Sequence, residues 1–210
     1  IGYDKRIGRK FLSPGPGFGG SCFKKDILNL VYLCRFYKLE DAANYWEQVL
    51  FINDWQKERI SSCIIEKFYG TVSNKNILIL GFAFKSNTND TRESPSIRIS
   101  KDLLENGARL FINDPKVGKK QIEQELELKE GEIDQLSLGS WTYADNIYHF
   151  SKNVDAIIIL TEWDSYKELN WEMISLNMRK PSWIFDTRNI VSKVDLAKLN
   201  INYWQVGITN

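Results

Sequence analysis

The sequence predicts an α/β protein, in which a partial helical region with a long connecting helix precedes a Rossmann-like, doubly wound domain with a parallel sheet. Three observations predict this order. Short, continuous apolar runs such as residues 76–81 are typical of parallel strands buried on both faces. Helical patterns alternate with these runs, which favours a doubly wound sheet. A long helical stretch over residues 41–68 comes before the first run.

The N-terminal region, residues 1–71, is expected to be helical after an initial loop. Residues 1–20 are rich in glycine and proline, which favours a loop. A helix is predicted to begin near Ser21, because apolar side chains follow it at helical spacing. The second helix covers residues 41–68, and Gly70 is a natural stop for it.

The C-terminal region, residues 72–210, is expected to contain the sheet. Ser94 and Pro95 predict a helix start, because serine is a good N-cap and proline fits the first helical turn. This helix would stop at Gly107 and complete a βαβ unit between two strands. The other expected elements are strands at 110–112, 155–161, 182–186 and 203–206, helices at 146–152 and 172–177, and a charged helix or loop at 119–131.

The composition is that of a soluble globular protein and argues against several functional classes. The 210 residues are 43% hydrophobic and 26% charged, with a formal net charge of +1. Near-neutral charge gives no electrostatic case for binding a nucleic acid or an anionic membrane. No apolar run approaches the roughly 18 residues of a membrane span, and the first residues resemble neither a signal peptide nor a transit peptide. We therefore expect a cytoplasmic protein without a nucleic-acid or membrane partner.

Three cysteines and one histidine limit the disulfide and metal chemistry. Cys22, Cys34 and Cys63 are odd in number and widely spaced, which argues against a disulfide framework and for reduced thiols. The sequence contains no C-x-x-C pair, so no metal site is expected. His149 lies in a predicted helix beside Phe150, and we expect a structural role for it.

The glycine-rich segment at residues 15–20 matches the pattern G-x-G-x-x-G, but we do not interpret it as a dinucleotide fingerprint. That pattern carries meaning directly after a strand, and no strand is predicted here. Pro14 and Pro16 also remove backbone N–H donors that a pyrophosphate would use. The alternative is a flexible loop.

Cys22 is the candidate nucleophile. It lies at a predicted helix start, where the helix dipole stabilises a thiolate, and Lys24 and Lys25 add positive charge. Asp26 follows four positions later and would share its helical face. These features favour an activated thiol. The alternative is a buried, inert cysteine, which suits the other two cysteines better.

A second candidate site lies where the predicted strands end. Lys85 and Arg92 lie in the segment after the first strand, and Arg188 follows a later strand. Ligands bind at the carboxyl ends of parallel strands, and these cations suit phosphate or carboxylate groups. The alternative is solvated cations that pair with nearby carboxylates such as Asp90. Asp114, after the second strand, would either meet a ribose or simply turn the chain.

Several long motifs together resemble those of the UDP-glucose/GDP-mannose dehydrogenase family. The segment GFGGSCFKKD at residues 17–26 is similar to the family's catalytic-cysteine motif. Further segments are similar to other family signatures, namely GFAFK at 81–85, DTRES at 90–94, TEWD at 161–164 and FDTR at 185–188. The resemblance covers essentially the whole chain.

The resemblance implies an oxidation of UDP-glucose to UDP-glucuronate in two hydride transfers, each to NAD⁺. Cys22 would add to the intermediate aldehyde as a thiohemiacetal. The second hydride transfer would give a thioester, which water hydrolyses. Asp26 matches the acidic residue that assists the water and the proton transfers.

The resemblance also implies binding residues, position by position. Those expected to contact the nucleotide sugar are Phe11, Leu12, Phe18, Gly19, Phe84, Lys85 and Arg188. Lys25 and Arg92 match residues that approach NAD, whereas Arg6 matches an arginine that reaches the neighbouring subunit's substrate. The long helix matches the element that links the domains and builds the dimer, so a homodimer or a higher homo-oligomer is expected.

The chain departs from the family pattern in places. Residues 13–16 look more like bacterial than eukaryotic members, Lys24 replaces a common Gln or Pro, and Thr187 replaces a Gly. The family's N-terminal Rossmann domain has no counterpart here, so the chain resembles the C-terminal half of the enzyme. Residues 1–71 would then be part of the central domain and residues 72–210 the UDP-sugar-binding domain.

This half-length match leads to three alternative functions. The first is the substrate-binding and thiol-bearing part of a dehydrogenase, which we expect to be inactive as this chain alone. The second is a non-catalytic nucleotide-sugar-binding or dimerisation module, in which Cys22 has no chemical role. The third is a related dehydrogenase that oxidises GDP-mannose or a UDP-N-acetyl sugar.

Overall fold

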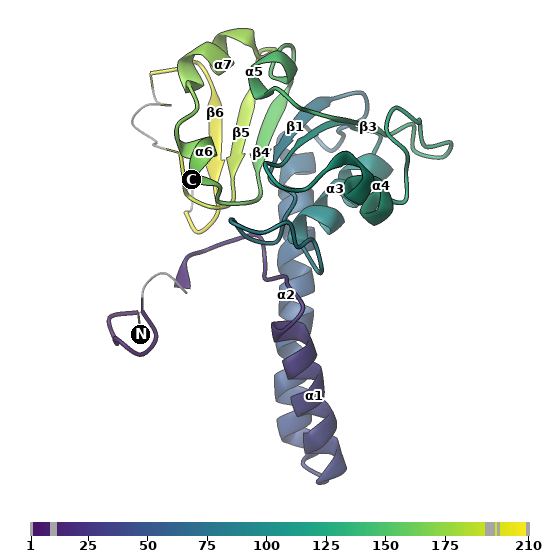
Figure 1. The fold of residues 1–210 in the computed structure, drawn as a ribbon, viewed down its shortest axis with the longest axis vertical. Helices are drawn as coiled ribbons and strands as arrows, with labels where there is room; N and C mark the ends of the chain where they lie inside the picture. Colours follow the sequence, from purple (N-terminus) through teal and green to yellow (C-terminus); the bar gives the residue numbers. More distant parts are fainter. Residues whose placement is uncertain (1, 9–11, 192–195, 197, 209–210) are drawn as a thin grey trace.

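A helical hairpin projects from an α/β body in the computed structural model, which describes residues 2–8, 12–191, 196 and 198–208 (Figure 1). The hairpin consists of α1 (Phe23–Phe36) and α2 (Glu40–Lys67). Both helices match the predicted ones to within about two residues. Among the described residues, no helix combines the length and the apolar character that a membrane span requires.

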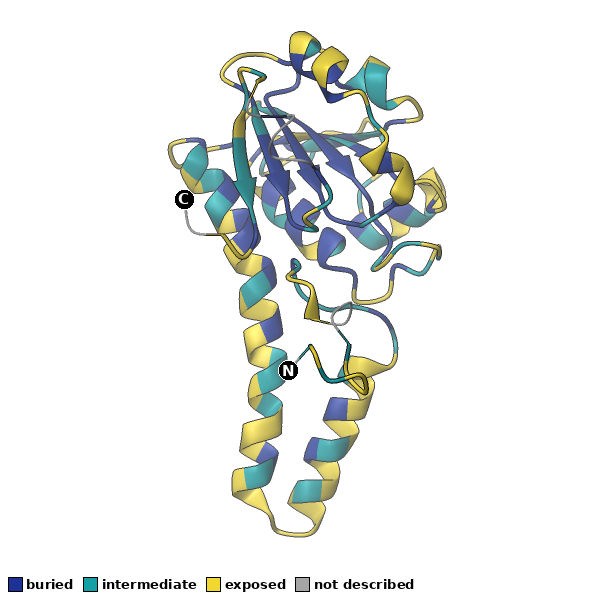
Figure 2. Cartoon of the chain, turned by 90° about the vertical axis from the view of Figure 1, so that its left-hand side faces the viewer, coloured by how far each residue is buried: buried dark blue, intermediate teal, exposed yellow. Residues whose placement is uncertain are grey.

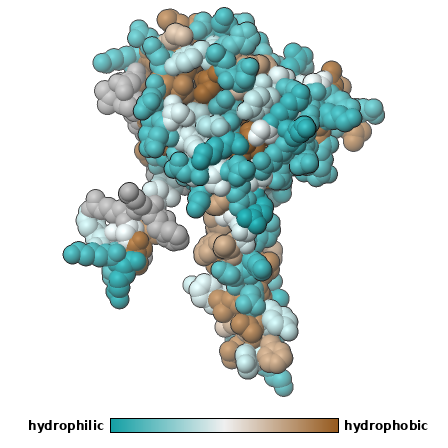
Figure 3. Space-filling view, viewed as in Figure 1, coloured by the Kyte–Doolittle hydropathy of each residue, from teal (hydrophilic) through white to brown (hydrophobic). Residues whose placement is uncertain are grey.

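The hairpin has a small apolar core of its own. Ile27 and Val31 of α1 and Ala43 of α2 are buried against each other. The ion pair between Arg35 and Glu47, with 2.8 Å between Nη2 and Oε2, links the two helices. Many other apolar side chains of the hairpin remain exposed, as the brown patches on its surface show (Figure 3).

The body contains a six-stranded sheet in which every pairing is parallel. The strands are β1 (Asn76–Leu80), β2 (Arg109–Asn113), β3 (Ser140–Tyr143), β4 (Ala156–Ile159), β5 (Trp183–Asp186) and β6 (Asn202–Gln205). Their spatial order is β3-β2-β1-β4-β5-β6, the order of a Rossmann-type sheet. Ile77 of β1 therefore lies between Leu110 of β2 and Ala156 of β4.

Short helices connect the strands and cover the sheet. They are α3 (Pro95–Glu105), α4 (Lys119–Leu126), α5 (Ile147–Phe150), α6 (Asp164–Lys167) and α7 (Trp171–Asn177). The start of α3 is the predicted one, because the Ser94 hydroxyl accepts a hydrogen bond from Ser96 N and Pro95 occupies the first helical position.

The central strands carry the main core, which appears as the dark blue sheet in Figure 2. All four residues of β4 are buried, as continuous apolar runs predict. The C-terminal half of α2 joins this core through Ile60 and Ile64, which are fully buried. The long helix therefore belongs to both parts of the chain, since its other half forms the hairpin.

The sequence-based prediction of the fold class is confirmed, and two elements were missed. The β3 strand was not predicted, because only Trp141 of its four residues is buried and no continuous apolar run marks it. The single-turn helix α6 was missed as well. Residues 203–206 do include an edge strand, β6, and the charged segment after residue 118 forms α4.

Candidate functional site

Three loops meet where the order of the strands reverses. In this sheet the reversal lies between β1 and β4, and ligands of such sheets bind in the crevice at the carboxyl ends there. The loop after β1 carries Phe84, Lys85 and Arg92, and the segment after β4 carries Glu162. Arg188 follows β5, so the predicted cations do gather at one edge of the sheet.

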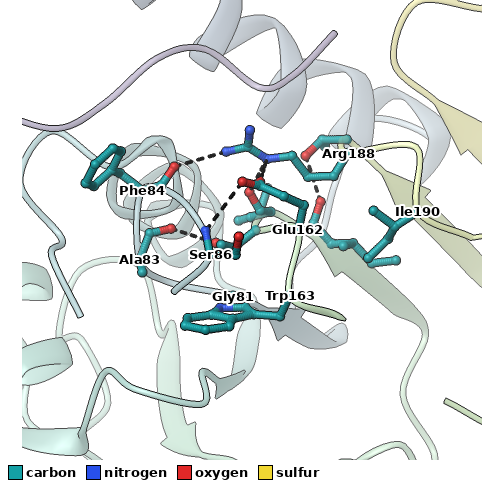
Figure 4. Close-up of polar contacts among 12 residues, drawn as sticks. Gly81, Ala83, Phe84, Ser86, Glu162, Trp163, Arg188 and Ile190 are labelled. Atoms are coloured by element: carbon teal, nitrogen blue, oxygen red, sulfur yellow. Dashed lines mark hydrogen bonds and ion pairs between the residues drawn. The ribbon is translucent and has the colours of Figure 1, made fainter. Parts of the chain in front are cut away.

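The side chain of Arg188 contacts the loops after β1 and β4 as well as belonging to the loop after β5 (Figure 4). Its Nε donates a hydrogen bond to Leu160 O at 2.7 Å, and its Nη2 donates to Phe84 O at 3.3 Å. Its Nε also lies 3.2 Å from Glu162 Oε2, and its side chain is only 16% exposed. Burial lowers the pKa of Arg188, while the Glu162 carboxylate opposes that effect. The alternative of a solvated surface arginine is therefore wrong.

The two other cations of the strand ends remain exposed. Lys85 Nζ lies 5.3 Å from the centre of the Phe84 ring, a cation–π distance. Arg92 forms an ion pair with Asp90, with 2.7 Å between Nη2 and Oδ2, as the alternative anticipated. The pKa of Arg92 is raised, mainly by its hydrogen bond to Asp90 and then by the charge of the Asp90 carboxylate.

Cys22 is exposed at the N-terminal end of α1, so the alternative of a buried cysteine is wrong for it. It occupies the N-cap position, and its Sγ lies 3.7 Å from Ser21 Oγ. Asp26 begins the helical hydrogen bonding, because its N–H donates to Cys22 O at 2.8 Å. Cys34 and Cys63 are partly buried, and burial raises the pKa of Cys63.

The two lysines beside Cys22 differ in their surroundings. Lys24 Nζ donates to both carboxylate oxygens of Glu93, each at 2.9 Å. Glu93 therefore offsets part of the positive charge that Lys24 was expected to bring to Cys22. Lys25 is exposed. The sequence could not show the partner of Lys24, because Glu93 lies 69 residues away.

The glycine-rich segment is packed rather than a free loop. Asn53 of α2 holds the Phe18 backbone with two hydrogen bonds: Phe18 N donates to Oδ1 at 2.7 Å, and Nδ2 donates to Phe18 O at 3.2 Å. Gln56 Nε2 donates to Gly15 O at 2.9 Å. Asn53 is only 7% exposed. Sequence reasoning missed this residue, because it stood inside an ordinary helical pattern.

The same segment lies against the loop after β1. Gly20 N donates to Arg92 O at 2.7 Å. A Cβ atom on Gly19 would stand 2.5 Å from Glu93 O, so no side chain fits there. The segment that leads into Cys22 is therefore fastened to the loop that carries the strand-end cations. This contact places the segment before Cys22 beside the loop of Arg92.

Two buried carboxylates accept backbone hydrogen bonds from the loops that follow the strands. Asp114 Oδ2 accepts from Phe82 N at 2.7 Å and Ala83 N at 3.0 Å, and its Oδ1 accepts from Val117 N at 2.9 Å. Asp114 therefore turns the chain, and its oxygens are not left for a ribose. Asp186 similarly accepts from Arg188 N at 3.0 Å, which orders the loop after β5.

The other residues that the sequence singled out have different surroundings, and one of them lies outside the described residues. Arg6 is exposed and paired with Asp4, with 2.7 Å between Nη2 and Oδ2. Both residues belong to the N-terminal segment, which lies apart from the sheet (Figure 1). Leu12 is exposed, and Phe11 lies outside the described residues. His149 lies in α5 with its ring against Phe150. Among the described residues, no cluster of three or more His, Cys, Asp or Glu could hold a metal ion.

The sheet order defines a Rossmann-type α/β protein, and the predicted cations lie at the carboxyl ends of its strands. Two family models match the chain. The UDP binding domain of the UDP-glucose/GDP-mannose dehydrogenase family matches residues 78–193, and the central domain of the same family matches residues 1–55. The chain belongs to the UDP-glucose/GDP-mannose dehydrogenase family.

Curated relatives and solved structures agree with this assignment. UDP-glucose 6-dehydrogenase 4 of Arabidopsis thaliana is 44% identical over 99% of this chain and 45% of its own length. UDP-glucose 6-dehydrogenase of Gallus gallus is 49% identical over 91% of this chain and 39% of its own length. A solved UDP-glucose dehydrogenase from the archaeon Pyrobaculum islandicum is 30% identical with a TM-score of 0.72, over 96% of this chain and 40% of that one. The chain thus spans less than half the length of these relatives.

Proposed function

We propose that this chain is the C-terminal, substrate-binding and thiol-bearing part of an NAD-dependent oxidoreductase that converts UDP-glucose to UDP-glucuronate. One observation carries the proposal. The segment leading into exposed Cys22 is hydrogen-bonded to the loop after β1, through Gly20 N and Arg92 O at 2.7 Å. A nucleotide sugar held at the strand ends would therefore lie beside a reactive thiol.

The chemistry assigned to Cys22 balances over two oxidations. The first removes a hydride and a proton from the primary alcohol of the sugar and leaves an aldehyde. The Cys22 thiolate adds to the aldehyde carbon, and the oxygen takes a proton, which gives a thiohemiacetal. Loss of a second hydride and of that proton gives a thioester. Water then adds to the acyl carbon, Asp26 accepts its proton, and the carbon–sulfur bond breaks to release the thiolate.

The nucleotide sugar is assigned to the strand ends. Arg188 and Lys85 supply positive charge for the diphosphate, and Arg188 does so with a planar donor group. Phe84 borders the same edge, while Phe18 and Gly19 bring the glycine-rich segment toward it. Leu12 and Phe11 would complete the wrap around the ligand, as the family motif implies.

The residues present fit part of an NAD site. Two molecules of NAD⁺ would accept one hydride each, and most of the NAD site would belong to a part of the protein outside this chain. Lys25 and Arg92 are exposed cations near Cys22, which suits the anionic pyrophosphate of a dinucleotide. An open depression of about 730 Å³, lined by residues 88–92 and the exposed face of α4, lies beside Arg92.

A homodimer or a higher homo-oligomer is proposed from the hairpin. Phe51, Ile52 and Trp55 of α2 are all more than half exposed, which is an unusual surface for a monomer. A second copy of the chain would cover such a face. Arg6 would reach the ligand of that copy. We also propose two domains, residues 1–71 and 72–210, and a cytoplasmic location, which the three unpaired cysteines favour.

Calorimetry with UDP-glucose tests the proposal on the 210-residue chain. We expect binding of UDP-glucose, and weaker binding of GDP-mannose and of a UDP-N-acetyl sugar. Preference for one of the other two would favour a related dehydrogenase instead. The chain alone should produce no NADH from UDP-glucose and NAD⁺, and NADH formation would contradict the assignment as one part of an enzyme.

A non-catalytic nucleotide-sugar-binding or dimerisation module is the second candidate. The pairing of Lys24 with Glu93 favours it, since this pairing removes one source of support for a thiolate. Alkylation by iodoacetamide at neutral pH separates the two candidates. The enzyme assignment predicts that Cys22 reacts faster than a model thiol, with Cys22→Ser as the control. Equal rates would favour the module.

A further inference from the structure

Glu162 contacts the loops that follow β1 and β5, at the carboxyl ends of the strands. It lies just after β4, and its Oε1 accepts a hydrogen bond from Ser86 N, in the loop after β1, at 3.4 Å. Its Oε2 lies 3.2 Å from Arg188 Nε, in the loop after β5. Figure 4 shows the carboxylate between these two partners. One side chain therefore connects three strand ends at the point where the sheet order reverses.

The pairing holds Arg188 in one orientation. Arg188 Nε and Nη2 also donate to the carbonyl oxygens of Leu160 and Phe84. A Cβ atom on Gly15 would be 3.3 Å from Nη1, so this remaining nitrogen faces the glycine-rich segment. Among the described residues, none donates a hydrogen bond to the buried Glu162 Oε2, so the ion pair is what balances it. A buried charge needs such a partner.

We propose that Glu162 is a positioning residue, which orients Arg188 so that its Nη1 edge meets the diphosphate of a nucleotide sugar. This inference rests on the proposed function. Binding to a group already held in its bound orientation avoids the entropy cost of ordering a long side chain. Removal of Glu162 would leave the guanidinium held only by its hydrogen bonds to Leu160 O and Phe84 O, so it would turn more freely, although its charge would remain.

The sign of the effect distinguishes positioning from simple electrostatics. A carboxylate beside a diphosphate repels it, so a purely electrostatic effect predicts tighter binding when Glu162 is neutralised. Positioning predicts weaker binding instead. The two explanations therefore predict opposite changes in the dissociation constant for the same substitution.

The test uses calorimetry of UDP with the 210-residue chain. We expect Glu162→Ala to raise the dissociation constant about tenfold, and Glu162→Gln, which keeps an acceptor for Ser86 N, to raise it about threefold. The matched control is Asp164→Asn, two residues away, because Asp164 is 81% exposed and pairs with Lys167. It should bind UDP as the wild type does.

A double-mutant cycle tests whether Glu162 acts through Arg188. In an Arg188→Ala background, Glu162→Ala should change the dissociation constant by less than about twofold. An undiminished tenfold effect there would overturn the positioning role. So would equal or tighter UDP binding by Glu162→Ala with an unchanged melting temperature. If Glu162→Ala does not fold, the same comparison is made with Glu162→Gln.

A second readout is independent of UDP affinity. The Nε–H of Arg188 should give a slowly exchanging NMR signal in the wild type and in Asp164→Asn, and a rapidly exchanging one in Glu162→Ala. An unchanged signal in Glu162→Ala would contradict the inference. Failure of the wild-type chain to bind UDP would contradict the proposed function, while this signal would still decide whether Glu162 orients Arg188.

Discussion

The sheet and the hairpin bury their apolar side chains in different ways. Every residue of β4 is buried, and the sheet core includes side chains as large as Trp141 and Phe185. In the hairpin, by contrast, Phe36 and Tyr45 are 66% and 70% exposed. The sheet thus completes its own core, whereas the hairpin presents apolar surface that another protein surface would cover.

The candidate site draws its residues from both the sheet and the hairpin. The strand-end residues are held by the rigid sheet, and Cys22 is held at the start of the hairpin. The two regions share α2, whose C-terminal half packs in the sheet core through Ile60 and Ile64. Polar contacts add to this link, since Asn53 of α2 holds Phe18 and Lys24 pairs with Glu93. Because the site needs both regions, changes in this junction should affect the site more than they affect the core.

The largest expected effect is on the sheet core. Ile158→Ala should lower the free energy of unfolding by about 3 kcal/mol, because it leaves a cavity in a fully buried strand. Ile52→Ala, in the exposed face of α2, should lower it by less than about 0.5 kcal/mol in a monomeric sample. Urea unfolding measures both. Similar losses would mean that the hairpin face is already covered in the free chain.

The second expected effect is on self-association. Ile52→Glu should shift the chain from dimer to monomer in sedimentation velocity, because a charge in the apolar face would be buried without a partner. The control is Leu176→Glu on α7, because Leu176 is also apolar and exposed but belongs to the sheet region. If the dimer survives Ile52→Glu but is lost in Leu176→Glu, the interface lies on the sheet region. That result would contradict the proposed hairpin interface.

The third expected effect is on the junction. Asn53→Ala should lower the free energy of unfolding by about 1–3 kcal/mol, since it leaves the Phe18 N–H and carbonyl without their partners. It should also increase the proteolytic cleavage rate within residues 15–20. Asn29→Ala, at an exposed position of α1, serves as the control. Unchanged cleavage in Asn53→Ala would show that the segment is held by other contacts.

The smallest expected effect is on the ion pair between Lys24 and Glu93. Lys24→Ala should cost no more than about 1 kcal/mol of stability, because both side chains are partly exposed and salt screens them. The difference from the wild type should shrink between 0.05 M and 1 M sodium chloride, as measured by urea unfolding. A loss that is large and independent of salt would assign Lys24 a packing role instead.

The fold was more predictable from the sequence than the site was. Continuous apolar runs reveal buried strands, and the Ser94-Pro95 pair reveals a helix start, because both signals are local. The β3 strand lacks such a run, since its side chains are only partly buried. The sequence also predicted that Lys85 and Arg188 lie at the same edge of the sheet, because the carboxyl ends of parallel strands share one edge.

The contacts that hold the site could not be predicted in the same way. Asn53 and Phe18 are 35 residues apart, and Lys24 and Glu93 are 69 apart. Their pairing depends on how the hairpin meets the sheet, which no local pattern encodes. Glu162 was visible only as one letter of the motif at residues 161–164, because its contact with Arg188 joins two different strand ends.

Hydrogen exchange with and without UDP-glucose tests the central claim most directly, namely that the strand ends and the thiol segment form one nucleotide-sugar site. UDP-glucose should slow exchange in residues 15–22, 81–92 and 186–191 together. Exchange should stay unchanged in residues 106–108, at the opposite edge of the sheet, and in residues 36–40, at the tip of the hairpin. Protection at that opposite edge, or protection of the strand ends without residues 15–22, would contradict the account.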